Sequence, residues 1–294
     1  MDSKARTRFG ILMLMPAIIM MVVFVAYPVL STVWSSFTNA KVQTRLPEFV
    51  GLENYIKVWK DPLVKSSMIF TVGFTVIATS IETVLGMLLA LIMNRKFKGQ
   101  GLVRAMILIP WAIPTIVSGM MWQFMFAEGY GIINQLLLRS GMAAASIPWL
   151  TNAKWSFLAI VIADTWKTSP YMSLMLLSGL QTIPVELYES SGIDGANAWN
   201  KFRYITLPLL KPVLMVSLLF RTVQSFRIYD LICALTNGGP ANSTQSLTMY
   251  TVKTYFNFGN TGYGAALAMV TFAVSMVIAF LFADGMKEKM GGGK

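Results

Sequence analysis

The amino-acid sequence predicts an all-α integral membrane protein. Of its 294 residues, 55% are hydrophobic and only 13% are charged, and the mean hydropathy is +0.60. A soluble domain carries about 25% charged residues, roughly twice this fraction. The apolar residues also form long continuous runs, whereas the strands of a membrane barrel would alternate apolar and polar residues. We therefore expect a bundle of membrane-spanning helices.

Six segments are apolar over the length that a helix needs to cross the hydrocarbon layer, about 20 residues. In chain order they are 9–33, 68–93, 103–126, 155–180, 212–235 and 262–283. The first and the last carry no charge, whereas the fourth and the fifth contain several charged residues. Because neither an internal repeat nor a low-complexity linker divides the chain, we expect a single transmembrane domain over residues 1–294.

Lysine and arginine residues outside these spans predict the orientation in the membrane. They are more than twice as dense in segments 1–8, 94–104, 181–211 and 284–294 as in the three segments between them. Cytoplasmic loops carry this excess of positive charge, so both termini and the 181–211 loop are expected in the cytoplasm. The same bias explains the net charge of +11 better than nucleic-acid binding does.

Several kinds of chemistry are excluded by composition. The chain has no histidine and one cysteine, Cys233, so it can build neither a histidine-based catalytic site nor an internal disulfide nor a cysteine metal cluster. It also lacks the glycine-rich phosphate-binding loop of ATPases. We therefore expect no catalytic residue, no metal and no cofactor on this chain.

The 181–211 loop has a pattern of its own. Pro184 can begin a helix, because the first helical position needs no N–H, and Asp194 and Gly195 then supply a turn. A second short helix follows, with apolar residues three apart on one face: Trp199, Phe202 and Ile205. Pro208 and Pro212 are expected to end it before the fifth span. The apolar face could dock a cytoplasmic partner or lie on lipid headgroups.

This loop resembles the EAA loop of permease subunits of bacterial binding-protein-dependent ABC importers. That pattern reads Glu-Ala-Ala, three residues, Gly, nine residues and Ile-x-Leu-Pro. The residues at the same spacing in this chain are Glu189, Ser190, Ser191, Gly195, Ile205, Leu207 and Pro208. Ser190 and Ser191 replace the two alanines, which exchanges one small residue for another.

The rest of the chain is similar to the sugar-type branch of these permeases. The similar segments occur in the order of that branch, at 108–111, 131–134, 226–230, 235–240 and 262–266. The resemblance implies six transmembrane helices, with the loop forming a cytoplasmic coupling helix between spans 4 and 5. It also implies that the two permeases of such an importer alternate between inward-open and outward-open states.

The resemblance implies several partners. They are a second homologous permease, an extracytoplasmic solute-binding protein, and two ATPase subunits that carry ATP and Mg. ATP-driven closure of the ATPases would then act on the permeases through the coupling loop. The contact residues implied by the resemblance are Glu189, Ser190, Ser191, Asp194, Gly195, Trp199, Phe202, Ile205, Leu207 and Pro208.

Charged residues inside the predicted spans suggest a second site, since ionisable groups within a bilayer are costly. They are Glu82, Asp164, Lys167, Arg221, Arg227 and Asp230. For Glu82, a hydrogen-bonded contact between helices is expected. Arg227 and Asp230 are three apart and can pair on one helix face. Candidates for a substrate path are Trp166, Lys167, Arg221, Gln224, Arg227, Tyr229 and Asp230. The alternatives are structural ion pairs, or span ends that reach the interface.

The resemblance therefore implies a permease subunit that moves a carbohydrate, expected to be an oligosaccharide, from a binding protein into the cytoplasm of a bacterium. The cations Lys167, Arg221 and Arg227 leave room for an acidic saccharide. Glycerol phosphate is an alternative cargo for the same machinery. A stand-alone secondary transporter is an alternative of another class, but it would need inverted repeats and a coupling-ion site.

Overall fold

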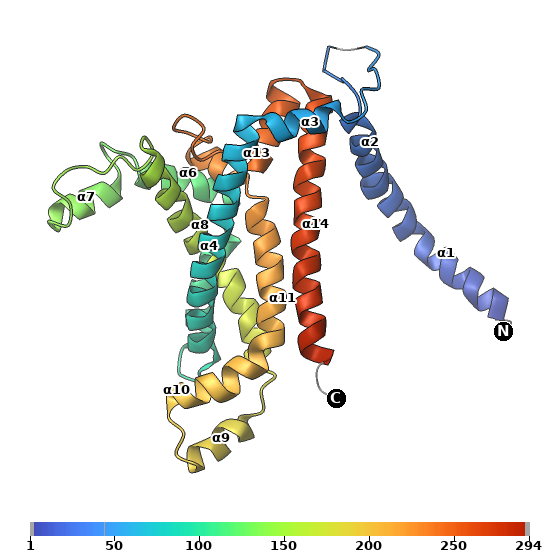
Figure 1. Ribbon diagram of the computed structural model, residues 1–294. Helices are drawn as coiled ribbons and strands as arrows, with labels where there is room; N and C mark the ends of the chain where they lie inside the picture. Colours follow the sequence, from blue (N-terminus) through green and yellow to red (C-terminus); the bar gives the residue numbers. More distant parts are fainter. Residues whose placement is uncertain (1–2, 44, 292–294) are drawn as a thin grey trace. The chain divides into compact units, whose positions relative to one another are not determined.

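The protein is built of helices, as the composition predicts (Figure 1). The computed structural model describes residues 3–43 and 45–291. Within these ranges the only pairing of extended backbone is a single antiparallel bridge between Thr38 and Phe49. The all-α prediction is therefore confirmed for the part of the chain that is described.

Fourteen α-helices and three wider π-helical turns, named η1 to η3, follow one another in the described residues. In order they are α1 (Ser3–Met21), η1 (Val22–Ala26), α2 (Tyr27–Ser36), α3 (Glu53–Lys60), α4 (Pro62–Asn94), α5 (Gln100–Ala112), α6 (Thr115–Met125), α7 (Ile132–Arg139), α8 (Ala153–Leu180), α9 (Val185–Ile193), α10 (Ala198–Lys201), η2 (Phe202–Thr206), α11 (Leu207–Phe226), α12 (Asp230–Leu235), α13 (Leu247–Val252), η3 (Lys253–Asn257) and α14 (Thr261–Gly291).

Four stretches of helix are long and apolar enough to cross a membrane. Among the described residues these are Ile11–Ser36, Pro62–Asn94, Ala198–Phe226 and Thr261–Gly285. They contain the expected second and sixth spans, all but residues 9 and 10 of the first, and most of the fifth. The pair α5 and α6 would make a fifth crossing if the two bent helices count as one. Helix α8 is long enough but is less apolar than these four.

The expected third span, 103–126, is not one straight helix. Its two halves, α5 and α6, meet at an angle of 90°. The break lies at Ile113 and Pro114, where both residues have extended backbone angles. A residue before proline is pushed out of the helical region, and proline itself donates no N–H to a helix. Pro110 lies inside α5 and does not end it.

The expected fifth span, 212–235, is wrong at both ends. One helical stretch runs from Ala198 through η2 to Phe226, so Pro208 and Pro212 do not end it. The wide turn η2 lets Leu207 N–H bond to the carbonyl of Phe202 and places Pro208 in the first turn of α11. Proline is tolerated there because it needs no donor. The span ends at Phe226, and α12 is a separate short helix.

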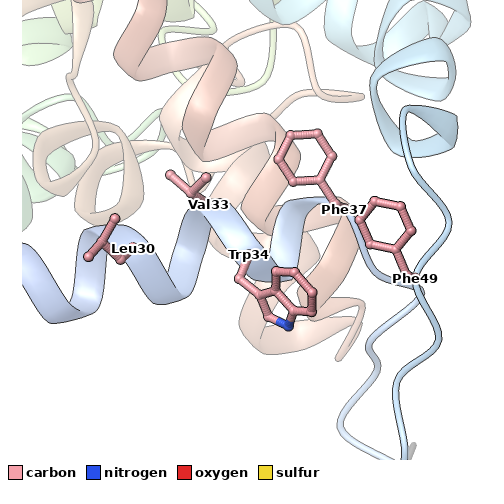
Figure 2. A pocket seen from close by; sticks show the side chains of 5 residues that line it. All are labelled: Leu30, Val33, Trp34, Phe37 and Phe49. Atoms are coloured by element: carbon pink, nitrogen blue, oxygen red, sulfur yellow. The ribbon is translucent and has the colours of Figure 1, made fainter.

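The described chain forms two compact units. The first consists of the residues up to Val64 together with Tyr250–Ala273, and the second of Lys65–Met249 together with the residues from Val274 on. In the first unit, Phe49 lies against Trp34 and Phe37, with ring centroids 5.9 and 6.3 Å apart. Figure 2 shows these rings beside an apolar hollow at the end of α2, with Leu30 and Val33 along the helix.

The second unit contains the two hydrophobic cores. An aromatic cluster includes Phe70, Phe74, Trp122, Phe126, Trp149 and Ile160. A methionine cluster includes Met87, Met93, Met172, Leu176, Leu180 and Leu210. Helices α4, α8 and α11 contribute to these cores, and α9 and α10 lie at one end of them (Figure 1). Most polar side chains of the site described below lie between the two clusters along these helices.

Candidate functional site

Three helices of the second unit are joined by a buried ionic cluster. The guanidinium of Arg221 on α11 donates to both carboxylate oxygens of Glu82 on α4, with 2.8 Å between Nη2 and Oε1. It also donates to Oδ2 of Asp164 on α8. The hydroxyl of Thr168 on α8 donates to Oε1 of Glu82 at 2.7 Å. Each of the three charged side chains is almost fully buried. The contact between helices expected at Glu82 is confirmed.

Lys167 balances the charge of this cluster. Its ammonium interacts electrostatically with Asp164 and donates to the carbonyl of Trp111 at 3.4 Å. Two carboxylates, one guanidinium and one ammonium therefore share a small region with no net formal charge. Buried ions are tolerated when they are paired and hydrogen-bonded. The cluster therefore connects α4, α8 and α11 without a net formal charge.

A cavity of about 370 Å³ opens beside the cluster, a volume in the range of small-molecule sites. Its floor contains the buried side chains of Asp164, Lys167 and Arg221. Its rim carries exposed polar side chains that come from the end of α11, the segment after it and the start of α12: Gln224, Arg227 and Asp230. Donors and acceptors therefore face one space within an otherwise apolar bundle.

Six of the seven residues expected on a substrate path line this cavity: Lys167, Arg221, Gln224, Arg227, Tyr229 and Asp230. The seventh, Trp166, does not. Its ring packs edge-on against Trp122, with centroids 5.6 Å apart, and belongs to the border of the aromatic cluster. On α8, Trp166 and Lys167 are adjacent, so they point in different directions, and only one can face the cavity.

The expected pairing of Arg227 with Asp230 on one helix face is not found. Arg227 lies just beyond the end of α11, and Asp230 is the first residue of α12. The N–H groups of Arg227 and Ile228 bond to carbonyls three residues back, which tightens the chain and ends the helix. The two side chains form no ion pair with each other, and both remain exposed on the rim.

The cavity also has lining residues that the sequence did not single out for the path. Trp111 and Thr115 lie on either side of the 90° bend between α5 and α6. The ring of Trp111 stacks on Tyr171, with centroids 5.9 Å apart. The sequence signal that could have found these residues was the pair Pro110 and Pro114. Prolines bend a span sharply, and the residues at the bend then face the bundle interior.

The loop between α8 and α11 has the local structure that its residues predict. Pro184 precedes α9, and α9 ends at Ile193 with Asp194 as its cap. Gly195 has a φ of +80°, a backbone conformation that glycine adopts without strain. The side chain of Asn197 then caps α10 by accepting a hydrogen bond from Asn200 N–H at 2.8 Å. The result is one short helix, α9, joined by a tight turn to α10, which continues through η2 into α11 instead of ending as a second short helix.

The residues implied as partner contacts divide into two groups. The exposed group is Glu189, Ser190, Asp194, Gly195, Trp199, Leu207 and Pro208, and the half-buried group is Ser191, Phe202 and Ile205. Phe202 and Ile205 pack against the methionine cluster of their own chain. Trp199 lies 5.8 Å from Phe202 between ring centroids but stays 63% exposed. The apolar face predicted for the second helix is therefore mostly used internally.

The most exposed apolar residue of the loop was not among the predicted contacts. Ile193 ends α9 with 89% of its surface exposed, directly before the turn at Gly195. Tyr188 anchors the same helix, since its hydroxyl bonds to Thr206 at 2.9 Å and its carbonyl accepts from the ammonium of Lys201 at 2.9 Å. Ile193 lies four residues after Glu189, so the two share a helix face.

Comparison with known protein families gives one match over most of the chain. Residues 82–290 match the family described as "Binding-protein-dependent transport system inner membrane component". This range includes Glu82, Asp164 and Arg221, the cavity and the loop around α9.

Similar proteins and structures span nearly the whole chain. The trehalose/maltose transport system permease protein MalF of Thermococcus litoralis is 42% identical over 287 residues, which cover 96% of each chain. The sulfoquinovosyl glycerol transport system permease protein SmoG of Agrobacterium fabrum is 40% identical over 281 residues, covering 95% of this chain and 91% of that protein. A crystal structure of a bacterial ABC transporter involved in the import of the acidic polysaccharide alginate shares the fold, with a TM-score of 0.84, 20% identity and coverage of 97% and 96%.

Proposed function

Since this chain belongs to the family of inner membrane components of binding-protein-dependent transport systems, we propose that it is the permease subunit of an ATP-driven sugar importer whose polar cavity forms part of the sugar path. The observation that supports this path is the 370 Å³ cavity, in which polar side chains of α8, α11 and α12 face one space inside an apolar bundle. Two relatives of similar length carry names of sugar permeases, for trehalose and maltose and for sulfoquinovosyl glycerol.

Six crossings account best for the helices. They are α1 with α2, α4, the bent pair α5 and α6, α8, α11 and α14. Helix α8 joins them although it carries Asp164 and Lys167, because both side chains are buried against the ionic cluster and the cavity. Charges inside a membrane are tolerated when they face the bundle interior. Given the distribution of Lys and Arg, both termini and the α9 turn lie on the cytoplasmic side.

In the cavity, the rim residues exchange hydrogen bonds with sugar hydroxyls. Gln224 and Arg227 donate and Asp230 accepts, while the rings of Trp111 and Tyr229 offer apolar faces. The floor residues are already paired with one another. A neutral sugar therefore meets replaceable donors and acceptors without displacing a buried charge pair. This arrangement suits cargo that must bind and then leave.

The loop around α9 supplies the contact with an ATPase. Glu189 and Ile193 on α9 and Gly195 in the turn after it are exposed. Phe202 and Ile205 support the loop from the bundle side. ATP and Mg bind to two ATPase partners, and a second permease completes the pair. The stretch Ile11–Ser36 supports that pairing, because no residue of its most apolar window is buried within the first unit.

Uptake by membrane vesicles tests the cavity. We expect Gln224→Ala combined with Asp230→Ala to lower binding-protein-dependent uptake of labelled trehalose and maltose at least tenfold, because each lost hydrogen bond is worth about 1 kcal/mol or more. Ser178→Ala is the matched control, since Ser178 is an exposed polar residue of α8 that does not line the cavity. Unchanged uptake by the double variant, with normal amounts of protein in the membrane, would reject the path.

A further inference from the structure

A second, larger hollow of the second unit has no part in the proposed sugar path. It is a groove of about 780 Å³ along α4, facing the stretch from α9 to α11. On the α4 side, Val84, Leu88 and Leu91 line its apolar length, and Asn94 and Arg95 line its end. None of these residues lines the smaller cavity.

The opposite wall of the groove also changes from apolar to polar in the same direction. Leu214 and Leu207 lie along the apolar length, and Lys201 and Trp199 lie at the polar end. Val84, Leu88 and Trp199 are each more than half exposed, so the groove is open rather than filled by its own side chains. Its shape and polarity therefore match a molecule with an apolar chain and a polar head.

The polar end carries positive charge only. Arg95 and Lys201 line it, and no aspartate or glutamate is among the lining residues. Within the described residues, neither cation forms an ion pair with an acidic side chain. The ammonium of Lys201 is held in place by its bond to the carbonyl of Tyr188, which leaves two of its donors for another partner. This end of the groove is complementary to an anion.

The length of the groove fits one leaflet of a membrane. Val84 on α4 and Arg95, the residue directly after α4, are eleven residues apart, which corresponds to about 16 Å at roughly 1.5 Å per residue of helix. Half of the hydrocarbon core is about 15 Å. The cationic end also coincides with the end of the apolar stretch at Asn94, where headgroups begin. Trp199 lies at the same end, and tryptophan is enriched at that level of a membrane.

We propose that this groove binds one anionic phospholipid of the cytoplasmic leaflet, with an acyl chain along Val84, Leu88 and Leu91 and its phosphate between Arg95 and Lys201. The leaflet assignment rests on the orientation given under the proposed function. The lipid would lie between α4 and the segment that joins α9 to α11. Its headgroup would thus bridge the end of a membrane helix and the base of the coupling loop.

Native mass spectrometry of the full chain tests this binding. Phosphatidylglycerol and phosphatidylcholine with identical acyl chains are titrated separately against the chain in detergent. We expect the wild-type chain to retain phosphatidylglycerol. We expect R95Q/K201Q to bind the same lipid about 20- to 30-fold more weakly, because two cation–headgroup interactions are lost. The control is Lys96→Gln with Lys98→Gln, two neighbouring exposed cations outside the groove, which should change binding less than about fivefold.

A second variant tests the apolar part. Leu88→Phe with Leu91→Phe fills the groove while leaving both cations, and we expect it to release phosphatidylglycerol. Glycerophosphoglycerol, which has the headgroup but no acyl chains, should not compete with the lipid for the wild type. Equal binding of phosphatidylcholine, full retention by R95Q/K201Q, or competition by glycerophosphoglycerol would each overturn the proposal, as would a polypeptide of a partner subunit occupying the groove in the assembled complex.

Rejection of the lipid site can be distinguished from rejection of the proposed function. Sugar uptake measured in parallel reports on the importer, whereas lipid retention is measured on the chain itself. Loss of specific lipid binding with intact uptake rejects only the lipid site. Absence of uptake with lipid binding intact rejects only the sugar path.

Discussion

At the scale of single residues, Arg221 joins three helices, because among the described residues its guanidinium is the charged group in direct contact with both Glu82 and Asp164. Two carboxylates could not stay buried beside each other without that cation. Breaking a buried pair by removing one partner costs about 3–5 kcal/mol, far more than the pair contributes relative to an apolar replacement. The role of Arg221 is therefore to hold α4, α8 and α11 in one arrangement.

We expect Arg221→Gln to destabilise the chain by about 3–5 kcal/mol, measured as a lower thermal unfolding midpoint in detergent. Arg227→Gln is the matched control, since Arg227 is exposed and lies six residues further on; its effect should stay within about 0.5 kcal/mol. Equal midpoints for the two variants would contradict the bridging role of Arg221.

Asp61 has a comparable role in the first unit. One of its carboxylate oxygens accepts hydrogen bonds from the hydroxyls of Tyr250 at 2.6 Å and Tyr263 at 2.7 Å, and the other accepts from Leu63 N–H at 2.8 Å. Burial raises the pKa of Asp61, but these hydrogen bonds outweigh it and hold the pKa below its usual 3.8. Burial and the bond to Asp61 raise the pKa of Tyr250 to about 12, so its hydroxyl remains a donor.

The sign of the pH dependence follows from this lowered pKa. The stabilisation by ionised Asp61 is fully present above the unfolded-state pKa of about 3.8 and is lost as the pH falls through the lower folded-state pKa. We expect the unfolding midpoint of Asp61→Asn to lie below that of the wild type by a constant amount between about pH 8 and pH 5, and the gap to narrow below about pH 4.

Glu53→Gln is the control for Asp61, because Glu53 pairs only with exposed Lys57 and such pairs contribute little. A gap between wild type and Asp61→Asn that widened as the pH fell would show that the lowered pKa is wrong.

At the scale of helices, close approach depends on particular glycines. A Cβ on Gly86 of α4 would meet the side chain of Met172 on α8 at 2.7 Å and the backbone N of Ser173 at 3.2 Å. Met172 is fully buried in the methionine cluster and has little room to move. Gly73, thirteen residues earlier on the same helix, would meet nothing within 4 Å.

These two glycines make a matched pair. We expect Gly86→Ala to lower the free energy of unfolding by about 1–3 kcal/mol through overpacking. Gly73→Ala should leave it unchanged or raise it by about 0.5–1 kcal/mol, because alanine restricts the unfolded chain and favours helix. Denaturant unfolding in detergent measures both values. Similar values for the two variants would show that α4 and α8 are not in contact at Gly86.

Helix α9 and its turn owe their form to local signals. Pro184 and Gly195 each act on their own backbone, so their effects could be predicted from the sequence. Asn197 acts in the same local way but was not predicted. The division of the apolar face into exposed and buried residues could not be predicted from the sequence. Trp199 is exposed while Phe202 and Ile205 pack on the methionine cluster, and that choice depends on residues of α4, α8 and α11 that are distant in the chain.

At the scale of the whole molecule, the exposed turn of α9 is the part of this chain that we propose contacts an ATPase. We expect Ile193→Asp to leave the unfolding midpoint of the purified chain unchanged, because Ile193 is 89% exposed. The same change should reduce recovery of an ATPase with the tagged chain from host membranes at least tenfold, since a charge would be buried in the contact.

Met142→Asp is the control for assembly, as Met142 is 78% exposed in the loop after α7, away from α9. It should not affect ATPase recovery. Undiminished recovery with Ile193→Asp would place the contact elsewhere than the turn of α9.

The sequence by itself determined the class of the protein, most of its helices, and the form of α9 and of the turn after it. Each depends on neighbouring residues: the length of an apolar run, a proline before a helix, a glycine in a turn. The family resemblance of the loop could be recognised for the same reason, since it consists of spacing within 20 residues, from Glu189 to Pro208.

Only the tertiary structure decided which polar groups meet. Glu82 and Arg221 are 139 residues apart in the chain, yet they share a hydrogen bond. Trp166 faces the aromatic cluster while Trp111 lines the cavity, and Arg227 and Asp230, three residues apart, do not pair. The physical reason is that a charge or ring is placed by what surrounds it on all sides, and those neighbours come from other helices.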